Sequence, residues 1–191
     1  MPGTHDVRER LTAAAFELLR EGGLGNASPA LIAERAGASK MSLYRHFTGV
    51  DELLAVALGE HDAEHRERLI GGGEGSPREH IEAMFAGAAG RADRPGYRGC
   101  VYVDTRVEVA DPDHPVAEVA RRHKAAMVAT LAALLESAGD PSAAETALRV
   151  QMLYDGAVVH AVLAGNGGPL RAALAALPGL GPALYPDGRS S

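Results

Sequence analysis

The chain has 191 residues, of which 46% are hydrophobic and only 4% aromatic, and its formal net charge is −6 at pH 7. This length gives room for one large core or two modest ones, and the alanine- and leucine-rich composition favours an all-α fold. The single cysteine excludes an internal disulfide. No apolar stretch approaches the roughly 18 residues of a membrane helix, and the opening MPGTHDVRERL lacks the apolar core of a signal peptide. We therefore expect a cytoplasmic protein without a membrane segment.

The first part of the chain predicts three helices. Residues 6–21 place apolar side chains at helical spacing, and Gly22-Gly23 ends that helix. Ser28 is a suitable N-cap, and Pro29 suits the first position of a second helix over 29–36. Ser39 then caps a third, short helix over 40–47. The sequence therefore predicts two short helices in succession after a longer one.

The remainder of the chain also reads as helical. Helices are predicted over 51–70, from Ser76-Pro77 to about residue 92, and over 116–138, 142–164 and 169–177, and the glycine-rich residues 71–75 predict a flexible joint. Residues 98–110 are ambiguous, because valines alternate with polar residues as in a strand. No partner strand is evident elsewhere in the sequence, so we expect a helix there.

The two short helices have the pattern of a helix-turn-helix, with Gly37 in the turn. Leu43 and Phe47 are expected to face inward, which leaves a partly outward set on the second helix: Lys40, Ser42, Tyr44, Arg45 and His46. Between Ala36 and Val50 the only charged side chains are basic, although the whole chain is acidic. Such a helix could enter the major groove of DNA, with Ser28 near a phosphate. Short helix pairs with a solvated face are also common, so spacing and charge leave both interpretations open.

The stretch SPALIAERAGASKMSLYRHFTGVDELLAVAL resembles the DNA-binding signature of the TetR family of transcriptional regulators. The likeness covers about residues 6–60, including Ala36-Gly37, Ser39-Lys40 and Leu43-Tyr44-Arg45-His46-Phe47. Residues 98–165 are more weakly similar to the ligand-binding and dimerisation region of one branch of the family. This resemblance implies a bacterial, DNA-binding domain over 1–48 and a ligand-binding and dimerisation domain over 49–191, with 49–70 as the connecting helix.

The resemblance also assigns residues to sites. The DNA-binding candidates are Ser28, Ser39, Lys40, Met41, Ser42, Tyr44, Arg45 and His46. Val50 and Ala30 stand where the family commonly has cations, and Met41 stands where it has a small residue or proline. Fewer phosphate contacts would weaken binding and make it less dependent on salt.

For the second domain, the resemblance implies that the helices over 116–138 and 142–164 form a homodimer. It also implies that a small-molecule effector releases the protein from double-stranded operator DNA. Most members of the family act as repressors, so the resemblance favours repression here. Polar or soft residues on otherwise apolar helices are the effector candidates: Cys100, Tyr102, Arg106, Met127, Met152, Tyr154, Asp155 and His160. Arg106 is a possible ion partner of Asp155. Residues of the two long helices could instead only build the core of one chain.

Two alternatives come from other functional classes. His61 and His65 in HDAEH have the i, i+4 spacing of zinc ligands, but Asp62 replaces the catalytic glutamate of the HExxH motif and no third ligand is evident. We therefore expect no enzyme activity, no metal and no cofactor. The second alternative is a helical interaction protein or ligand-binding protein that has weak or no DNA binding.

Overall fold

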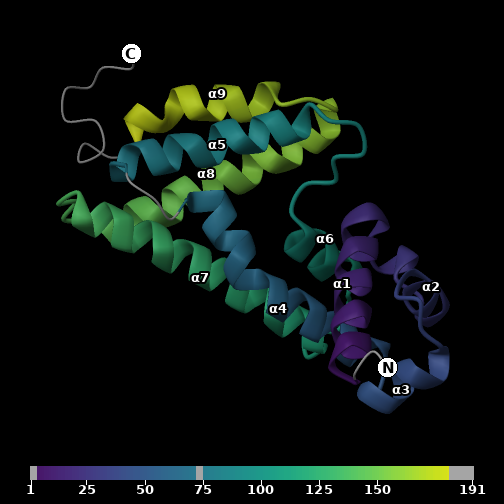
Figure 1. The fold of residues 1–191 in the computed structure, drawn as a ribbon. Coiled ribbons are helices and arrows are strands. Elements are labelled where there is room, and N and C mark those ends of the chain that lie inside the picture. Colours follow the sequence, from purple (N-terminus) through teal and green to yellow (C-terminus); the bar gives the residue numbers. More distant parts are fainter. Residues whose placement is uncertain (1–3, 72–74, 181–191) are drawn as a thin grey trace. The chain divides into compact units, whose positions relative to one another are not determined.

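The computed structural model describes residues 4–71 and 75–180, and the regular structure within these ranges is entirely helical (Figure 1). The all-α class is therefore confirmed. The helices in chain order are α1 (Thr4–Gly22), η1 (Leu24–Asn26), α2 (Pro29–Arg35), α3 (Lys40–His46), α4 (Val50–Ile70), α5 (Pro77–Ala92), α6 (Val101–Glu108), α7 (Pro115–Ser137), α8 (Ala143–Ala164), α9 (Gly168–Ala176) and η2 (Leu177–Gly179).

The chain divides into two compact units that do not follow the chain order. The first unit combines residues up to Ala63 with Cys100–His123, and the second combines Glu64–Gly99 with the residues from Lys124 onward. Helices α4 and α7 each contribute to both units, because each continues through a boundary. The assignment of DNA binding to 1–48 and of ligand binding to 49–191 remains a prediction about function, which this division by packing does not decide. Most of the predicted joint at 71–75 lies outside the described residues.

The core of the first unit is formed by α1, the two short helices and the beginning of α4, with α6 and the first turns of α7. Leu11, Leu19, Ile32, Leu43 and Leu53 are at most 1% exposed in this core. Their spacing within each helix is the apolar stripe on which the sequence prediction rested. Residues 100–123 thus return to complete the core around the short helices.

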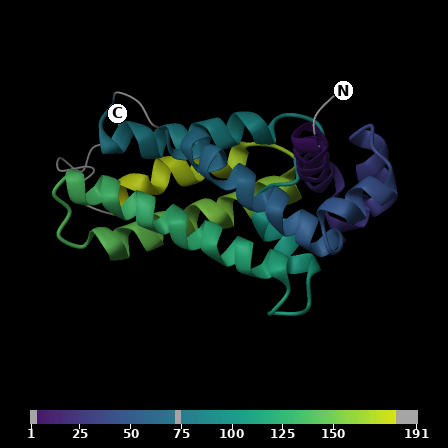
Figure 2. The same ribbon diagram turned by 60° about the horizontal axis from the view of Figure 1, so that its bottom comes forward.

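The second unit is built around α5, α8 and α9, which lie alongside one another in both ribbon views (Figures 1 and 2). Its core contains Phe85, Met127 and Leu131, each at most 1% exposed. The ring of Phe85 meets that of Tyr154 edge to face, with centroids 5.2 Å apart. At Gly167 a Cβ would come within 2.3 Å of the carbonyl oxygen of Ala89, so the close approach of α9 to α5 requires glycine there.

The ambiguous segment 98–110 is helical over Val101–Glu108, so the strand alternative is wrong. Val101, Tyr102 and Thr105 are buried, which is the spacing of one helical face, whereas Val107 is 78% exposed. The Oγ1 hydroxyl of Thr105 donates to the carbonyl of Val101 one turn earlier. The alternating valines are therefore distributed around a short helix, and burial of Tyr102 outweighs their preference for strands.

Side-chain caps explain why several helices begin where the sequence predicts. Ser28, Ser39 and Ser76 each accept a hydrogen bond from a backbone N–H in the first turn of the helix that follows. At α5 the pair is reciprocal, because Glu79 also accepts from the backbone N–H of Ser76. The described residues include no helix with the length and hydropathy required to span a membrane.

Candidate nucleic-acid interface

The turn between α2 and α3 fixes the direction of α3. Ser28 Oγ lies 3.3 Å from the backbone nitrogen of Leu31 and caps α2. Gly37 has φ of 59°, a left-handed conformation that favours glycine over any residue with a side chain. Ile32 and Ala33 of α2 are buried, and α2 packs against both α1 and α3, so the turn places α3 against the core of the first unit.

Ser39 begins α3 and stabilises its first turn. Its Oγ accepts from the backbone N–H of Ser42 at 3.0 Å, and the two serine hydroxyls are also 3.0 Å apart. Leu43 is fully buried and Phe47 is 4% exposed, so these two side chains anchor the helix to the core. The pattern of inward residues on α3 is as the sequence predicted.

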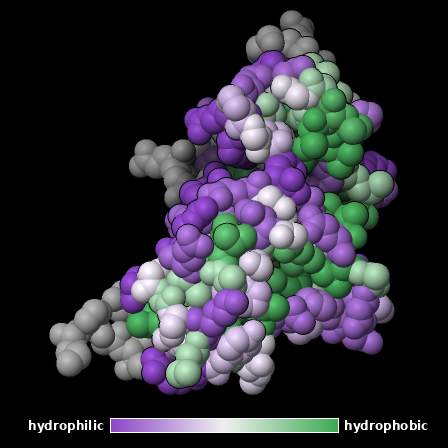
Figure 3. Space-filling model, turned by 90° about the vertical axis from the view of Figure 1, so that its right-hand side faces the viewer, coloured by the Kyte–Doolittle hydropathy of each residue, from purple (hydrophilic) through white to green (hydrophobic). Residues whose placement is uncertain are grey.

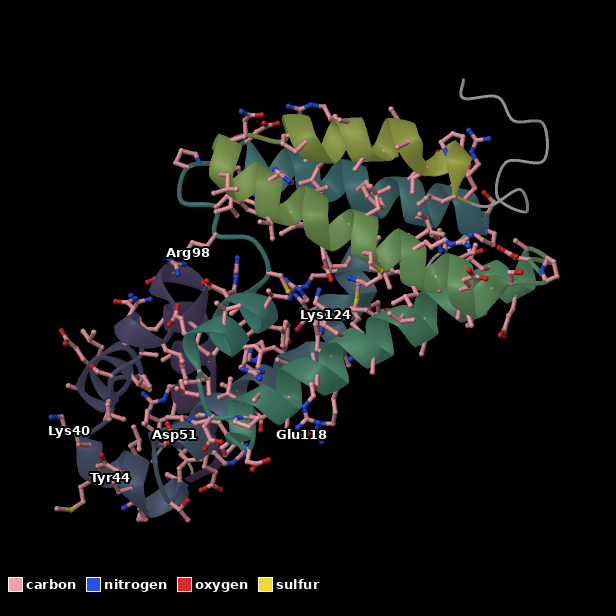
Figure 4. The ribbon with its side chains drawn as sticks, turned by 180° about the vertical axis from the view of Figure 1, so that it is seen from behind. Lys40, Tyr44, Asp51, Arg98, Glu118 and Lys124 are labelled. Carbon is pink, nitrogen blue, oxygen red and sulfur yellow. The ribbon has the colours of Figure 1, made fainter. Side chains whose placement is uncertain are left out.

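The opposite side of α3 carries an exposed group of basic, aromatic and apolar side chains. Lys40, Met41, Tyr44 and Arg45 are all exposed, and their spacing places them on one helical face. Met41 is 82% and Tyr44 56% exposed, which is unusual for such large side chains. Figure 4 shows Lys40 and Tyr44 close together on α3, directed outward. The side of the molecule that includes α2 mixes hydrophilic and hydrophobic residues at its surface (Figure 3).

Other predicted DNA contacts are less accessible. Ser28, Ser42 and His46 are partly buried, and Nε2 of His46 is buried without a hydrogen-bond partner among the described residues. This ring nitrogen therefore faces the protein. Ser39 is exposed but its hydroxyl is already engaged in the cap.

Two sets of polar contacts hold α3 against its neighbours in the first unit. The guanidinium of Arg8 lies 5.6 Å from the ring centroid of Phe47 and forms a 2.6 Å ion pair with Glu60 of α4. Glu52 Oε2 accepts from the hydroxyl of Thr48 at 2.6 Å and from its backbone N–H at 2.7 Å. These hydrogen bonds, led by the hydroxyl, hold the pKa of Glu52 below its usual value. They fix the start of α4 directly after α3.

Arg35 of α2 is engaged within the protein. Its two terminal nitrogens donate to both carboxylate oxygens of Glu21, at 2.9 and 3.0 Å. This hydrogen bonding lowers the pKa of Glu21 and raises that of Arg35. Ala30 and Val50 stand at the two positions where the family commonly has a basic residue. Ala30 is exposed, and Val50 packs partly against the core of the first unit.

The predicted effector residues are distributed between the two units. Cys100, Tyr102 and Arg106 belong to the first unit. Tyr102 is fully buried, donates its hydroxyl to the carbonyl of Leu58 at 3.0 Å and stacks on His123 at 3.8 Å between centroids. Arg106 donates to the carbonyl of Val109. These contacts stabilise the packing of the first unit.

The remaining effector candidates, Met127, Met152, Tyr154, Asp155 and His160, belong to the second unit. Met127 and Tyr154 are buried, whereas Met152 and His160 are exposed on α8, so neither of the latter lines an enclosed site in one chain. Asp155 forms a 2.6 Å ion pair with Lys124, which takes the place that the sequence analysis considered for Arg106.

Sequence reasoning did not select Lys124 or Gln151 as site residues. Gln151 Nε2 donates to the same Asp155 oxygen that accepts from Lys124, at 2.9 Å. Gln151 and Asp155 have i, i+4 spacing on one helix, so the sequence did contain a signal for the hydrogen bond between them. Nothing in the sequence indicates that Lys124 of α7 reaches Asp155 of α8, because that pairing depends on how the two helices pack.

A surface hollow of about 350 Å³ lies at the turn between α7 and α8, where its lining includes Glu136, Asp140 and Glu145. None of the predicted effector residues lines it. The HDAEH histidines do not form a metal centre with other side chains, because no group of three or more candidate ligands occurs among the described residues. His61 stacks on Phe16 at 4.1 Å between centroids, and Asp62 contacts His123.

Comparison with known proteins finds bacterial transcriptional regulators of the TetR type. Residues 11–57 match the model of the bacterial regulatory proteins of the tetR family, which includes all of α2 and α3. A curated relative, the HTH-type transcriptional regulator BetI 1 of Chromohalobacter salexigens, is 38% identical over 91 residues. That alignment covers 44% of each protein, so the chain matches less than half of the length of this relative.

Solved structures cover nearly the whole chain. A putative TetR-type transcriptional regulator from Streptomyces avermitilis is 31% identical, with a TM-score of 0.79 over 90% of this chain and 95% of that one. A TetR-family regulator from Streptomyces coelicolor is 24% identical, with a TM-score of 0.80 over 97% of both chains. The reduced form of NemR from E. coli has a TM-score of 0.80 at 23% identity over 91% of this chain and 96% of that one. The last two likenesses concern the fold alone.

Proposed function

The chain belongs to the TetR family of DNA-binding transcriptional regulators, and from that premise we propose that it is a cytoplasmic repressor that binds a palindromic operator as a homodimer and is released by a small molecule. The observation that carries the DNA-binding part of the proposal is the exposed face of α3. Lys40, Met41, Tyr44 and Arg45 share that face, and no acidic side chain occurs between Ala36 and Val50. A cationic, amphipathic helix face of this kind suits the major groove.

Each side chain of this face has a role that its chemistry supports. Lys40, at the first position of α3, can donate to a guanine edge or to a phosphate, and the Met41 side chain can contact a thymine methyl group. Tyr44 and Arg45 lie one turn later, where a phenol or a guanidinium can reach the phosphate backbone. Ser28 could bind a phosphate through the N-terminal end of α2, although its hydroxyl already caps that helix. These assignments are proposals.

The homodimer is supported by the exposed side of α8. Leu148, Met152, Val159 and Leu163 are each at least 50% exposed, and their spacing along the helix places them on one face. The exposed residues of α7 include Ala125, Ala129 and Ala133, which offer close approach but little apolar area. We therefore place the centre of the dimer face on α8. Leu131 and Leu135 of α7 and Ala161 of α8 lie on helices that the sequence analysis assigned to the interface, but these three side chains are buried in the core of one chain.

The proposed regulatory step is a change in the separation of the two α3 helices of the dimer. Operator half-sites have a fixed spacing, so an effector that favours a different separation lowers DNA affinity. Because the relatives are transcriptional regulators, we propose that the chain acts by binding and not by catalysis. Repression is the more common action in the family and is the action that we propose.

The test is selection of binding sites from random duplex DNA with the purified full chain, repeated at about 50 and 200 mM salt, because phosphate contacts make affinity salt-dependent. Enrichment of a palindrome would support a dimeric regulator, its half-site spacing would give the separation of the two α3 helices, and its base sequence would identify the promoter. A folded dimer that enriches no sequence, even after any co-purified small molecule has been removed, would instead favour the alternative of an interaction protein that has lost DNA binding.

A further inference from the structure

Three polar side chains of the second unit form a connected cluster between α7 and α8. Lys124 Nζ lies 2.6 Å from Asp155 Oδ1, and Gln151 Nε2 donates to the same oxygen at 2.9 Å. The ion pair is partly exposed, with 25% of the Lys124 side chain and 34% of the Asp155 side chain accessible. Lys124 is labelled in Figure 4, where it projects from α7. The cluster is electrically neutral as a whole.

Gln151 is the buried member of this cluster and has one unused polar atom. The residue is 3% exposed, and its Oε1 has no hydrogen-bond partner among the described residues. Rotating the amide by 180° would not help, because it would place the oxygen against the carboxylate of Asp155 and lose the Nε2 hydrogen bond. The ion pair therefore fixes the orientation of the amide, and Oε1 is left as an acceptor that needs a donor.

The surroundings of this acceptor limit what can supply that donor. Tyr154 lies three positions after Gln151 on α8, and Met127 lies three positions after Lys124 on α7, so each is on the same side of its helix as the cluster. Both side chains are buried, and the ring of Tyr154 meets that of Phe85, so this part of the core offers soft and aromatic surface. A charged ligand would be poorly accommodated, because Asp155 and Lys124 already neutralise each other and a further buried charge would have no counter-ion. A neutral molecule with an apolar body and a single N–H or O–H donor would supply the missing hydrogen bond without introducing a buried charge.

We propose that Gln151 is the specificity residue of the effector site, and that the effector is a neutral, largely apolar molecule that donates one hydrogen bond to Gln151 Oε1. This inference rests on the proposed function in that it assumes an effector within the second unit. Asp155 and Lys124 are positioning residues, because they hold the amide so that its oxygen faces the ligand. The hydrogen bond selects among ligands of similar size, because a methylated analogue would leave Oε1 unsatisfied.

The experiment uses matched pairs of probes that differ only in the donor: indole with 1-methylindole, and 2-naphthol with 2-methoxynaphthalene. Their dissociation constants are measured by isothermal titration calorimetry on the full chain, on Gln151→Leu and on the control Thr146→Val. Thr146 is also a buried polar residue of α8, at 2% exposure, so its replacement controls for loss of polarity on that helix. We expect the donor-bearing probe of at least one pair to bind about tenfold or more tightly to the wild type and to the control.

Gln151→Leu should abolish this preference while changing the unfolding midpoint little, because the loss of the Nε2 hydrogen bond to Asp155 is offset by the removal of an unsatisfied buried oxygen. Equal binding of both members of every pair, absence of binding by all four probes, or a preference that survives in Gln151→Leu would overturn the proposal. DNA binding of the same preparations is measured separately. A wild-type chain that prefers the donor probes but binds no DNA would leave this inference standing and refute the proposed function.

Discussion

Oδ1 of Asp62 lies 2.6 Å from Nδ1 of His123, so a polar pair joins α4 to α7 inside the first unit. His123 is 1% exposed and its ring stacks on that of Tyr102 from α6. The next residue along α7 is Lys124, which belongs to the second unit and pairs with Asp155 there. Adjacent positions of one continuous helix thus each have a polar partner, His123 within the first unit and Lys124 within the second.

The Asp62–His123 pair should contribute measurably to stability. We expect Asp62→Ala to lower the free energy of unfolding by about 1–3 kcal/mol, because a buried imidazole nitrogen loses its hydrogen-bond partner. Asp62→Asn keeps an oxygen at the same distance and should lose less. Urea unfolding followed by circular dichroism measures both variants. Equal losses for the alanine and asparagine variants would show that the hydrogen bond is not the stabilising contact.

The exposed face of α3 should carry operator binding. Tyr44→Ala and Lys40→Ala are expected to reduce affinity for the selected operator by about tenfold or more, and Lys40→Ala should lower the slope of log K against log salt by about 1 if the lysine neutralises a phosphate. Both side chains are exposed, so the unfolding midpoint should change little. Fluorescence anisotropy with labelled duplex measures affinity and salt slope. Arg20→Ala, which removes an exposed cation of α1, is the control and should bind as the wild type does.

The apolar face of α8 should hold the dimer together. Leu163 is 77% exposed, and Leu163→Glu would place a charge in the proposed interface, so we expect monomers at micromolar concentration. Size-exclusion chromatography with light scattering gives the mass. Val107→Glu is a matched control, because Val107 is 78% exposed but lies on α6 of the first unit. Ala129→Glu tests whether α7 contributes to the interface. If this variant is also monomeric, α7 is part of the dimer interface together with α8.

The cap of α4 should make stability depend on pH in the acid range. Because hydrogen bonds from Thr48 lower the pKa of folded Glu52 below the ordinary 4.5, its contribution is complete above that value and is lost as the pH falls through the lowered one. Thermal unfolding of the wild type and of Glu52→Gln is compared between about pH 6 and pH 3. The wild type should be the more stable at the upper end, and the difference should shrink on acidification. A difference that is constant with pH would mean that the carboxylate charge has no part in the cap.

Gly37 should resist substitution because of its backbone and not because of crowding. The nearest heavy atom to an added Cβ would be a terminal nitrogen of Arg10 at 3.4 Å, an ordinary contact, whereas φ is +59°. We expect Gly37→Ala to cost about 1–2 kcal/mol, the usual penalty of a left-handed conformation. Gly49→Ala is the comparison, since a Cβ there meets nothing within 4 Å and its φ is not positive. Equal stability of the two variants in urea would contradict the argument.

Much of the fold could be predicted from local patterns in the sequence. Ser28, Ser39 and Ser76 begin their helices because a hydroxyl and the next few backbone N–H groups interact within one turn. The outward and inward sides of α3 follow from the spacing of Leu43 and Phe47 in the same way. By contrast, the valine alternation of 98–110 could not decide between helix and strand, because that depends on what Tyr102 packs against.

The amino-acid sequence alone determined the all-α class, the two short helices with a glycine turn, and the acid-free stretch that leaves a basic face on α3. Each of these depends on interactions between residues only a few positions apart. Only the tertiary structure decided that residues 100–123 pack with the first unit, that Asp62 meets His123, and that Lys124 pairs with Asp155 while Gln151 is left with a buried acceptor. The Asp62–His123 and Lys124–Asp155 pairings join side chains 61 and 31 positions apart, and the angles and separations of packed helices that bring them together are not encoded in any local pattern.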